Sequence, residues 1–219
     1  PKGVVALLCF ALLWPPAAGA ALKIDFTHID GPVEAGWQGY FASHESAETF
    51  TAQRYTAFGV TVTVAPSWPS NPTRQAMQMI DRPMGSDLML DWIGTDARIA
   101  NADPLLLTIG GLPAGRYSWT SWHHDPQDQT GRFDVTVTDA AGTATTRGVD
   151  ISAGDIAFEA MTRFETALVS DGVNPVSLSF DNQGHVDVTE AFFVLNAFAL
   201  DADEPCYNHP PVIEGPGVL

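Results

Sequence analysis

The chain has 219 residues, with 26 acidic against 10 basic side chains and a formal net charge of −16. Such a field repels phosphate backbones and anionic headgroups, which argues against nucleic acid and membrane surfaces as partners. It also favours cations such as Ca²⁺, although the solubility of an exported protein explains the charge more simply.

The first 20 residues have the layout of a secretory signal peptide. Lys2 is the positive end, residues 3–14 are apolar, and Ala18-Gly19-Ala20 is a small-residue cleavage site. The apolar stretch is shorter than the about 20 residues that a bilayer span needs. We therefore expect a secreted or cell-surface protein without membrane insertion. Cys206 would be the single cysteine of the mature chain, and its partner is unassigned.

The mature chain alternates β-rich runs with turn residues about every ten positions, which is typical of an antiparallel β-sandwich. A chain of this length can form one such domain over residues 21–200. The expected strands are residues 22–26, 50–55, 59–64, 75–80, 105–109, 117–123, 132–139, 143–149, 158–169 with a break, 176–181 and 192–200. One short helix is expected at residues 87–94, where apolar side chains follow helical spacing.

Two hairpins are predicted. The first joins the strands 105–109 and 117–123, and the second covers residues 133–146 around an Asp-Ala-Ala-Gly turn. Along the strand 117–123, alternation places Trp119 on the core face and Trp122 nearer the surface.

The same strand leads to His123, His124 and Asp125, which we expect at a rim of the domain. Three interpretations stay open for this triplet: a catalytic metal site, a polar sugar-binding or Ca²⁺-linked rim, and a hydrogen-bonded structural pair. The metal interpretation lacks further ligands at a suitable spacing.

Residues 201–219 combine acids, proline and glycine as linkers do. Within them, residues 209–216 resemble the entry strand of an immunoglobulin-like or cadherin-like repeat. We expect further domains in the same chain.

Several short motifs resemble the malectin-like and galactose-binding-like jelly rolls of bacterial secreted proteins. They are Lys23-Ile-Asp-Phe26, Gly36-Trp-Gln-Gly-Tyr-Phe41, Asp81-Arg82 with Leu90-Asp-Trp-Ile-Gly-Thr-Asp96, and Gly111-Leu-Pro-Ala-Gly-Arg-Tyr117. The resemblance covers residues 23–200 and implies an all-β jelly roll that binds carbohydrate without catalysis. It also implies that Asp25 contributes to a structural Ca²⁺ site. The sequence departs from the usual pattern at residues 80–82 and 123–125.

Sugars stack their C–H faces on aromatic rings and hydrogen-bond to polar side chains, so aromatic and polar residues near predicted loops are the candidate ligand contacts. The predicted set is His123, His124, Asp125, Asp91, Trp92, Arg82, Trp37, Tyr40 and Trp68. We therefore expect a carbohydrate-binding module whose partner is a glycan or polysaccharide. The alternatives are an adhesion or spacer repeat that binds no sugar, and a small hydrolase built on residues 123–125.

Overall fold

The computed structural model describes residues 21–42, 52–66, 77–81, 86–96, 104–127, 130–182 and 192–203. The expected signal peptide, Trp68, Arg82 and residues 204–219 lie outside these ranges. Across the described ranges, no helix is both long enough and apolar enough to cross a membrane.

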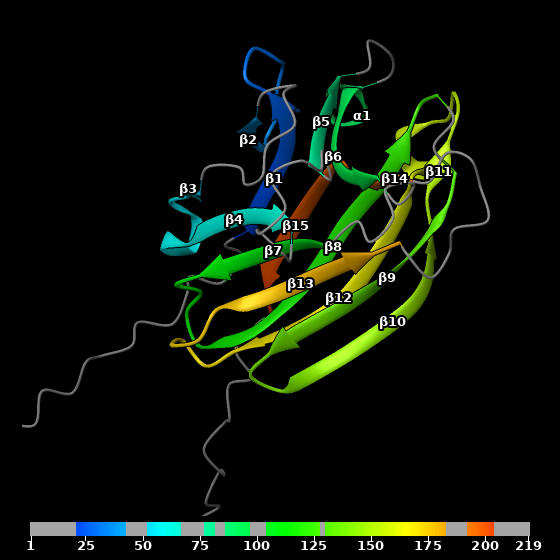
Figure 1. The fold of residues 1–219 in the computed structure, drawn as a ribbon. Helices are drawn as coiled ribbons and strands as arrows, with labels where there is room; N and C mark the ends of the chain where they lie inside the picture. Colours follow the sequence, from blue (N-terminus) through cyan, green and yellow to red (C-terminus); the bar gives the residue numbers. More distant parts are fainter. Residues whose placement is uncertain are drawn as a thin grey trace, which may run out of the picture.

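Two six-stranded sheets lie face to face and form the body of the molecule (Figure 1). Sheet A contains β1 (Ala21–His28), β2 (Gln38–Ala42), β8 (Gly115–Asp125), β11 (Ser152–Ala153), β12 (Thr162–Ser170) and β15 (Ala197–Ala202). Sheet B contains β3 (Gln53–Arg54), β4 (Thr61–Pro66), β7 (Leu105–Gly110), β9 (Arg132–Asp139), β10 (Gly142–Asp150) and β13 (Val176–Asp181). The chain is therefore an all-β antiparallel sandwich, as its strand pattern predicts; the pairs β1–β2 and β8–β11 are parallel.

A third, three-stranded sheet closes one end of the sandwich, at the top of Figure 1. Sheet C contains β5 (Met77–Asp81), β6 (Asp91–Asp96) and β14 (Phe192–Leu195), and the one-turn helix α1 (Asp87–Leu90) runs directly into β6. The helix predicted over residues 87–94 is therefore wrong beyond Leu90. Strand β5 bonds to one edge of β6 and β14 to the other. Pairing with these distant strands overrides the local helical spacing.

The core lies between sheets A and B, and alternation along the strands fills it. On β9, Phe133, Val135 and Val137 are buried, and the intervening residues are more exposed. Strand β9 pairs with β10 around the predicted turn, with a register shift between Thr146 and Val149, so the predicted hairpin at residues 133–146 is confirmed.

The predicted hairpin of residues 105–123 is wrong, because its two strands belong to different sheets. Strand β7 pairs with β4 and β13 of sheet B, whereas β8 pairs with β12 and β15 of sheet A. The connecting turn crosses between the layers, with Gly111 at a φ of 77° and Leu112 buried. Glycine-rich turns serve hairpins and crossings alike, so local sequence does not separate the two.

Candidate functional site

His123 is a core residue rather than a rim residue. It is completely buried and packs against Phe133 and Phe193, at centroid distances of 4.6 Å and 5.7 Å. Its Nδ1 lies 2.6 Å from the Val194 carbonyl and its Nε2 2.8 Å from the Ser121 hydroxyl. Since a carbonyl accepts only, Nδ1 carries the proton and Nε2 accepts from Ser121. Burial lowers the pKa of His123 to about 3, so the ring is neutral.

His124 and Asp125 are also buried, and the prediction that the triplet lies at a rim is wrong. The Ser152 hydroxyl donates to the His123 carbonyl (3.1 Å), so it accepts from His124 Nδ1 at 3.1 Å. Burial lowers the pKa of His124. Asp125 Oδ1 accepts a hydrogen bond from Trp92 Nε1 at 3.2 Å. The three side chains are thus held by separate structural partners rather than converging on one point.

Two predicted site residues, Asp91 at the start of β6 and Asp25 on β1, are buried acids. Asp91 Oδ2 accepts bonds from the Thr27 hydroxyl (2.8 Å) and the His28 amide (2.9 Å). Asp25 Oδ2 accepts from the Glu34 amide at 2.8 Å, and Oδ1 has no hydrogen-bond partner among the described residues. Burial, reinforced by the charges of Asp91, Glu34 and Asp87, raises the pKa of Asp25 to about 7.

The Ca²⁺ site implied for Asp25 is not completed by these acids. Calcium takes 6–8 oxygen ligands, and Asp25 brings one free carboxylate oxygen. Within the described ranges, no group of three or more acidic, histidine or cysteine side chains has a geometry that could hold a metal ion. The described residues therefore do not fit the ion by themselves.

Asn196, between β14 and β15, is a buried junction that the sequence did not point to. Its side chain accepts from the His124 amide (2.7 Å) and donates to the Asp91 carbonyl (3.0 Å). Its backbone bonds to Trp122 and Phe26. One asparagine thus ties β8, β6 and β1 together, and its only sequence signal is a polar residue inside an apolar strand.

Aromatic side chains gather on the outer face of sheet A, the side turned away from sheet B. The aromatic cluster consists of Trp37, Trp122 and Phe158. The Trp37 ring meets Trp122 edge-on at 5.2 Å, and Phe158 stacks beside Trp122 at 6.4 Å and 21°. Trp122 is 9% exposed and Phe158 36%, and Trp37 lies between buried and exposed. Lys23 Nζ lies 5.8 Å from the centre of the Trp37 ring.

Polar and small residues continue this face along β8. Cross-strand registers place Trp122 between Ala197 and Arg163, and Thr120 between Ala199 and Glu165. In the next row Ser118 lies between Asp201 and Ala167, and Arg116 follows beside Val169. Small side chains thus form the middle of the face, and exposed charged side chains flank them.

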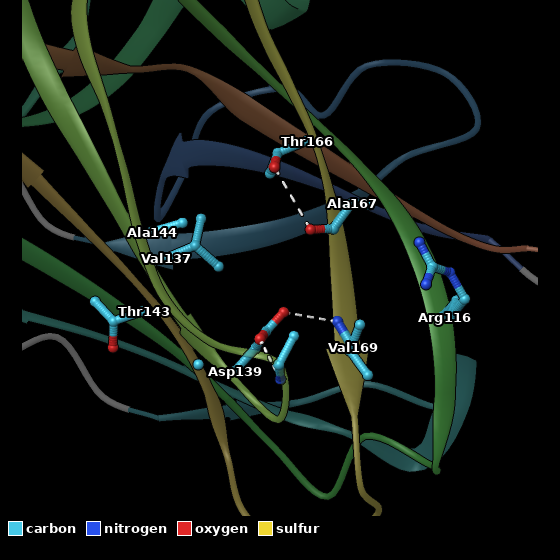
Figure 2. A pocket seen from close by; sticks show the side chains of 10 residues that line it. Arg116, Val137, Asp139, Thr143, Ala144, Thr166, Ala167 and Val169 are labelled. Atoms are coloured by element: carbon cyan, nitrogen blue, oxygen red, sulfur yellow. Dashed lines mark hydrogen bonds between the residues drawn. The ribbon is translucent and has the colours of Figure 1, made fainter.

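A pocket of about 270 Å³ adjoins this face where the edge of β12 meets the β9–β10 hairpin. Figure 2 shows Arg116 on one side of β12, with Val137, Thr143 and Asp139 on the other. This pocket has no counterpart in the predicted site.

Of the predicted ligand residues, Trp37 alone lies at the aromatic cluster. Tyr40 is buried against Phe26 at 5.2 Å, and burial raises its pKa to about 12. Trp92 is buried as well. Trp68 and Arg82 fall outside the described residues, so their roles stay predictions. Trp119 is core at 1% exposure and Trp122 is more exposed, as alternation along β8 predicts.

No protein-family model matches the chain, and no curated protein matches it in sequence. Among solved structures, it is similar to the CBM22-1 and GH10 modules of the Clostridium thermocellum endo-1,4-β-D-xylanase Xyn10B complexed with xylohexaose, with 12% identity and a TM-score of 0.40. That match covers 59% of this chain, which spans 24% of the xylanase modules.

Two smaller structures are also similar. The CBM22-1 xylan-binding domain of Paenibacillus barcinonensis Xyn10C has 12% identity and a TM-score of 0.36, with 73% of this chain and 89% of that one covered. TmCBM61, in complex with β-1,4-galactotriose, has 11% identity and a TM-score of 0.33, with 65% and 88% covered.

Proposed function

We propose that the chain is a non-catalytic carbohydrate-binding module of an exported modular protein, and that its glycan lies along the outer face of sheet A. The observation that carries this proposal is the aromatic cluster of Trp37, Trp122 and Phe158 at one end of that face. These rings lie outside the core between sheets A and B. Trp122 belongs to a second, smaller buried cluster with Leu88, Met89 and Met161, and Trp37 packs against that cluster.

The chemistry of the cluster suits a sugar. Partly exposed aromatic rings offer flat apolar surface to the C–H faces of a pyranose. Lys23 beside Trp37 and Arg163 beside Trp122 supply hydrogen-bond donors for ring hydroxyls, and Glu165 supplies an acceptor. Apolar rings bordered by such polar groups are the usual composition of a ligand site.

The length of the face favours an oligosaccharide over a single sugar. Trp122 and Arg116 are six positions apart on β8, or about 20 Å at the rise of a strand. Thr120 and Ser118 occupy the positions between them, and no large side chain of β8 interrupts the track. A chain of several sugar units therefore has room to lie along the strand.

The test begins with a glycan-array screen and continues with calorimetry on the best neutral hit. Trp37→Ala and Phe158→Ala are each expected to weaken binding about three- to tenfold, the value of one aromatic contact. The control is Phe41→Ala, which removes an exposed ring (44%) from edge strand β2 of the same sheet. Equal losses in all three variants would contradict the assignment to the aromatic cluster. No hit on the array would favour the adhesion or spacer repeat.

A further inference from the structure

The pocket beside β12 is closed at one end by hydrogen bonds between the two sheets. The Val169 amide donates to Asp139 Oδ2 at 2.8 Å, and the Val169 carbonyl accepts from the Ala140 amide at 3.0 Å. Asp139 Oδ1 accepts from the Ala141 amide at 2.8 Å. Both carboxylate oxygens are therefore occupied by the main chain, and Asp139 serves as part of the wall.

Beyond this closure, the edge of β12 faces the pocket. In an antiparallel strand, residues two apart point their N–H and C=O groups the same way. Val169 points both groups towards the hairpin, so Ala167 presents its own pair in the same direction. The carbonyl of Ala167 accepts only a long bond from the Thr166 hydroxyl, at 3.4 Å (Figure 2). The pocket thus offers a main-chain donor and acceptor.

Arg116 is the cationic side chain of the pocket. Two other arginines of the described chain are neutralised, Arg132 by Asp150 at 2.7 Å and Arg147 by Asp134 at 3.1 Å. Arg116 is exposed and has no ion pair among the described residues. A guanidinium presents parallel donors that match the two oxygens of a carboxylate.

The remaining lining completes a site for a small polar ring. Val137, Ala144 and Val169 give apolar surface, and Thr166 brings a hydroxyl group. The Thr143 hydroxyl is bonded to Thr138 at 3.2 Å. The volume of about 270 Å³ lies just below the usual range for ligand pockets, so one ring fits rather than a chain.

We propose that this pocket binds a single uronic acid residue, with its carboxylate on Arg116 and its ring against the edge of β12 at Ala167 and Val169. The inference rests on the proposed function. A glycan that lies along the outer face of sheet A from the aromatic cluster reaches Arg116 at the far end of that face. The expected ligand is a glycan whose sugars are neutral except for one acidic sugar at its end. A polyuronate is disfavoured, because the chain carries a formal charge of −16.

The experiment is an amide NMR titration of the whole chain with methyl α-D-galacturonide and methyl β-D-glucuronide, each compared with its neutral glycoside. At least one uronide is expected to shift the amide signals of Ala167, Val169 and Thr143 and to bind more tightly than its neutral partner. Arg116→Gln should weaken that binding about two- to fivefold, as loss of an ion pair in an exposed site does. The matched control is Arg54→Gln, which removes the same charge from sheet B.

Two results would overturn the proposal: no shift of these amides with either uronide, or equal losses in the Arg116 and Arg54 variants. Equal binding of acetylalanine would also overturn it, because the pocket would then recognise any carboxylate. Trp37→Ala separates this proposal from the previous one. That variant is expected to leave the binding of the monosaccharide uronide unchanged, whereas it weakens the binding of the neutral glycan.

Discussion

The outer faces of the two large sheets differ sharply in chemistry. On sheet B, registers align Thr143, Thr138, Ser177, Thr108 and Thr63 in one row across five strands. Neighbouring threonines bond to each other, as in the Thr136–Thr145 pair at 2.9 Å. On sheet A, the corresponding surface carries the aromatic cluster and exposed charges.

The two faces meet different physical requirements. A row of threonines needs only β-propensity and contact with water. Partly exposed tryptophan and phenylalanine rings gain little from remaining in water, so their presence on one face favours a binding role there. The same strand pattern thus underlies both faces, and side-chain chemistry distinguishes them.

The largest expected effect concerns the two sides of β8. Trp119 stacks on Phe198 at 4.5 Å inside the core, and Thr120 is its neighbour on the outer face. Trp119→Ala is expected to lower the free energy of unfolding by about 3–5 kcal/mol through loss of a buried ring. Thr120→Ala should change it by less than about 0.5 kcal/mol. Chemical denaturation measures both, and a loss below about 1 kcal/mol in the tryptophan variant would contradict the assignment of faces.

The second-largest effect is expected at Asp25, which bonds to the Glu34 amide in the segment that leads to Trp37. Its pKa of about 7 exceeds the ordinary value of 3.8, so the folded state holds the proton more tightly than the unfolded state. Its contribution to stability is therefore present below about pH 4 and is lost as the pH rises to about 7. Asp25→Asn should raise the free energy of unfolding by about 2–4 kcal/mol at pH 8 and leave it unchanged near pH 4.

Chemical denaturation of the unchanged chain and of the Asp25→Asn variant between about pH 4 and pH 8 measures this difference in the free energy of unfolding. The charged groups facing Asp25 are Asp91, Glu34 and Asp87, all acidic. A difference between the two proteins that does not depend on pH would contradict the account.

A somewhat smaller effect is expected at His123. His123→Phe keeps an aromatic ring among Phe133 and Phe193 but leaves the Val194 carbonyl and the Ser121 hydroxyl without their partner. The expected loss is about 2 kcal/mol, the penalty for unpaired buried polar groups. In the unchanged chain, NMR should show a neutral Nδ1–H ring from pH 8 down to pH 5. Titration of the ring within that interval would contradict its place in the core.

The smallest effect is expected on sheet B. Thr145→Val replaces one exposed hydroxyl of the threonine surface, and the free energy of unfolding should change by less than about 0.5 kcal/mol. Glycan affinity should not change. Calorimetry with the neutral hit checks this, and a loss of affinity would place the ligand on the opposite sheet.

Alternation and turn spacing predict most of the strands, because the hairpin β9–β10 and the buried side of β8 are encoded in neighbouring residues. Strand β6 and the crossing between β7 and β8 depend on partners distant in sequence, which local patterns do not contain. The candidate site is less predictable from the sequence than the strands are. His123 and His124 look like ligands in the sequence, and only the packing of Phe133, Val194 and Ser152 around them shows that they are structural. Phe158 begins the short 3-10 helix η2 (Phe158–Ala160), and its proximity to Trp122 carries no sequence signal.

Indole N–H resonances offer the most direct measurement of where the glycan binds. The chain has 6 tryptophans, of which Trp37 and Trp122 belong to the aromatic cluster, and Trp92 and Trp119 are buried elsewhere. On titration with the neutral glycan identified on the array, the Trp37 and Trp122 indole signals should shift with one common saturation curve. The Trp92 and Trp119 signals should stay in place. Saturable binding that leaves the Trp37 and Trp122 signals unmoved would contradict the assignment of the outer face of sheet A as the glycan-binding surface.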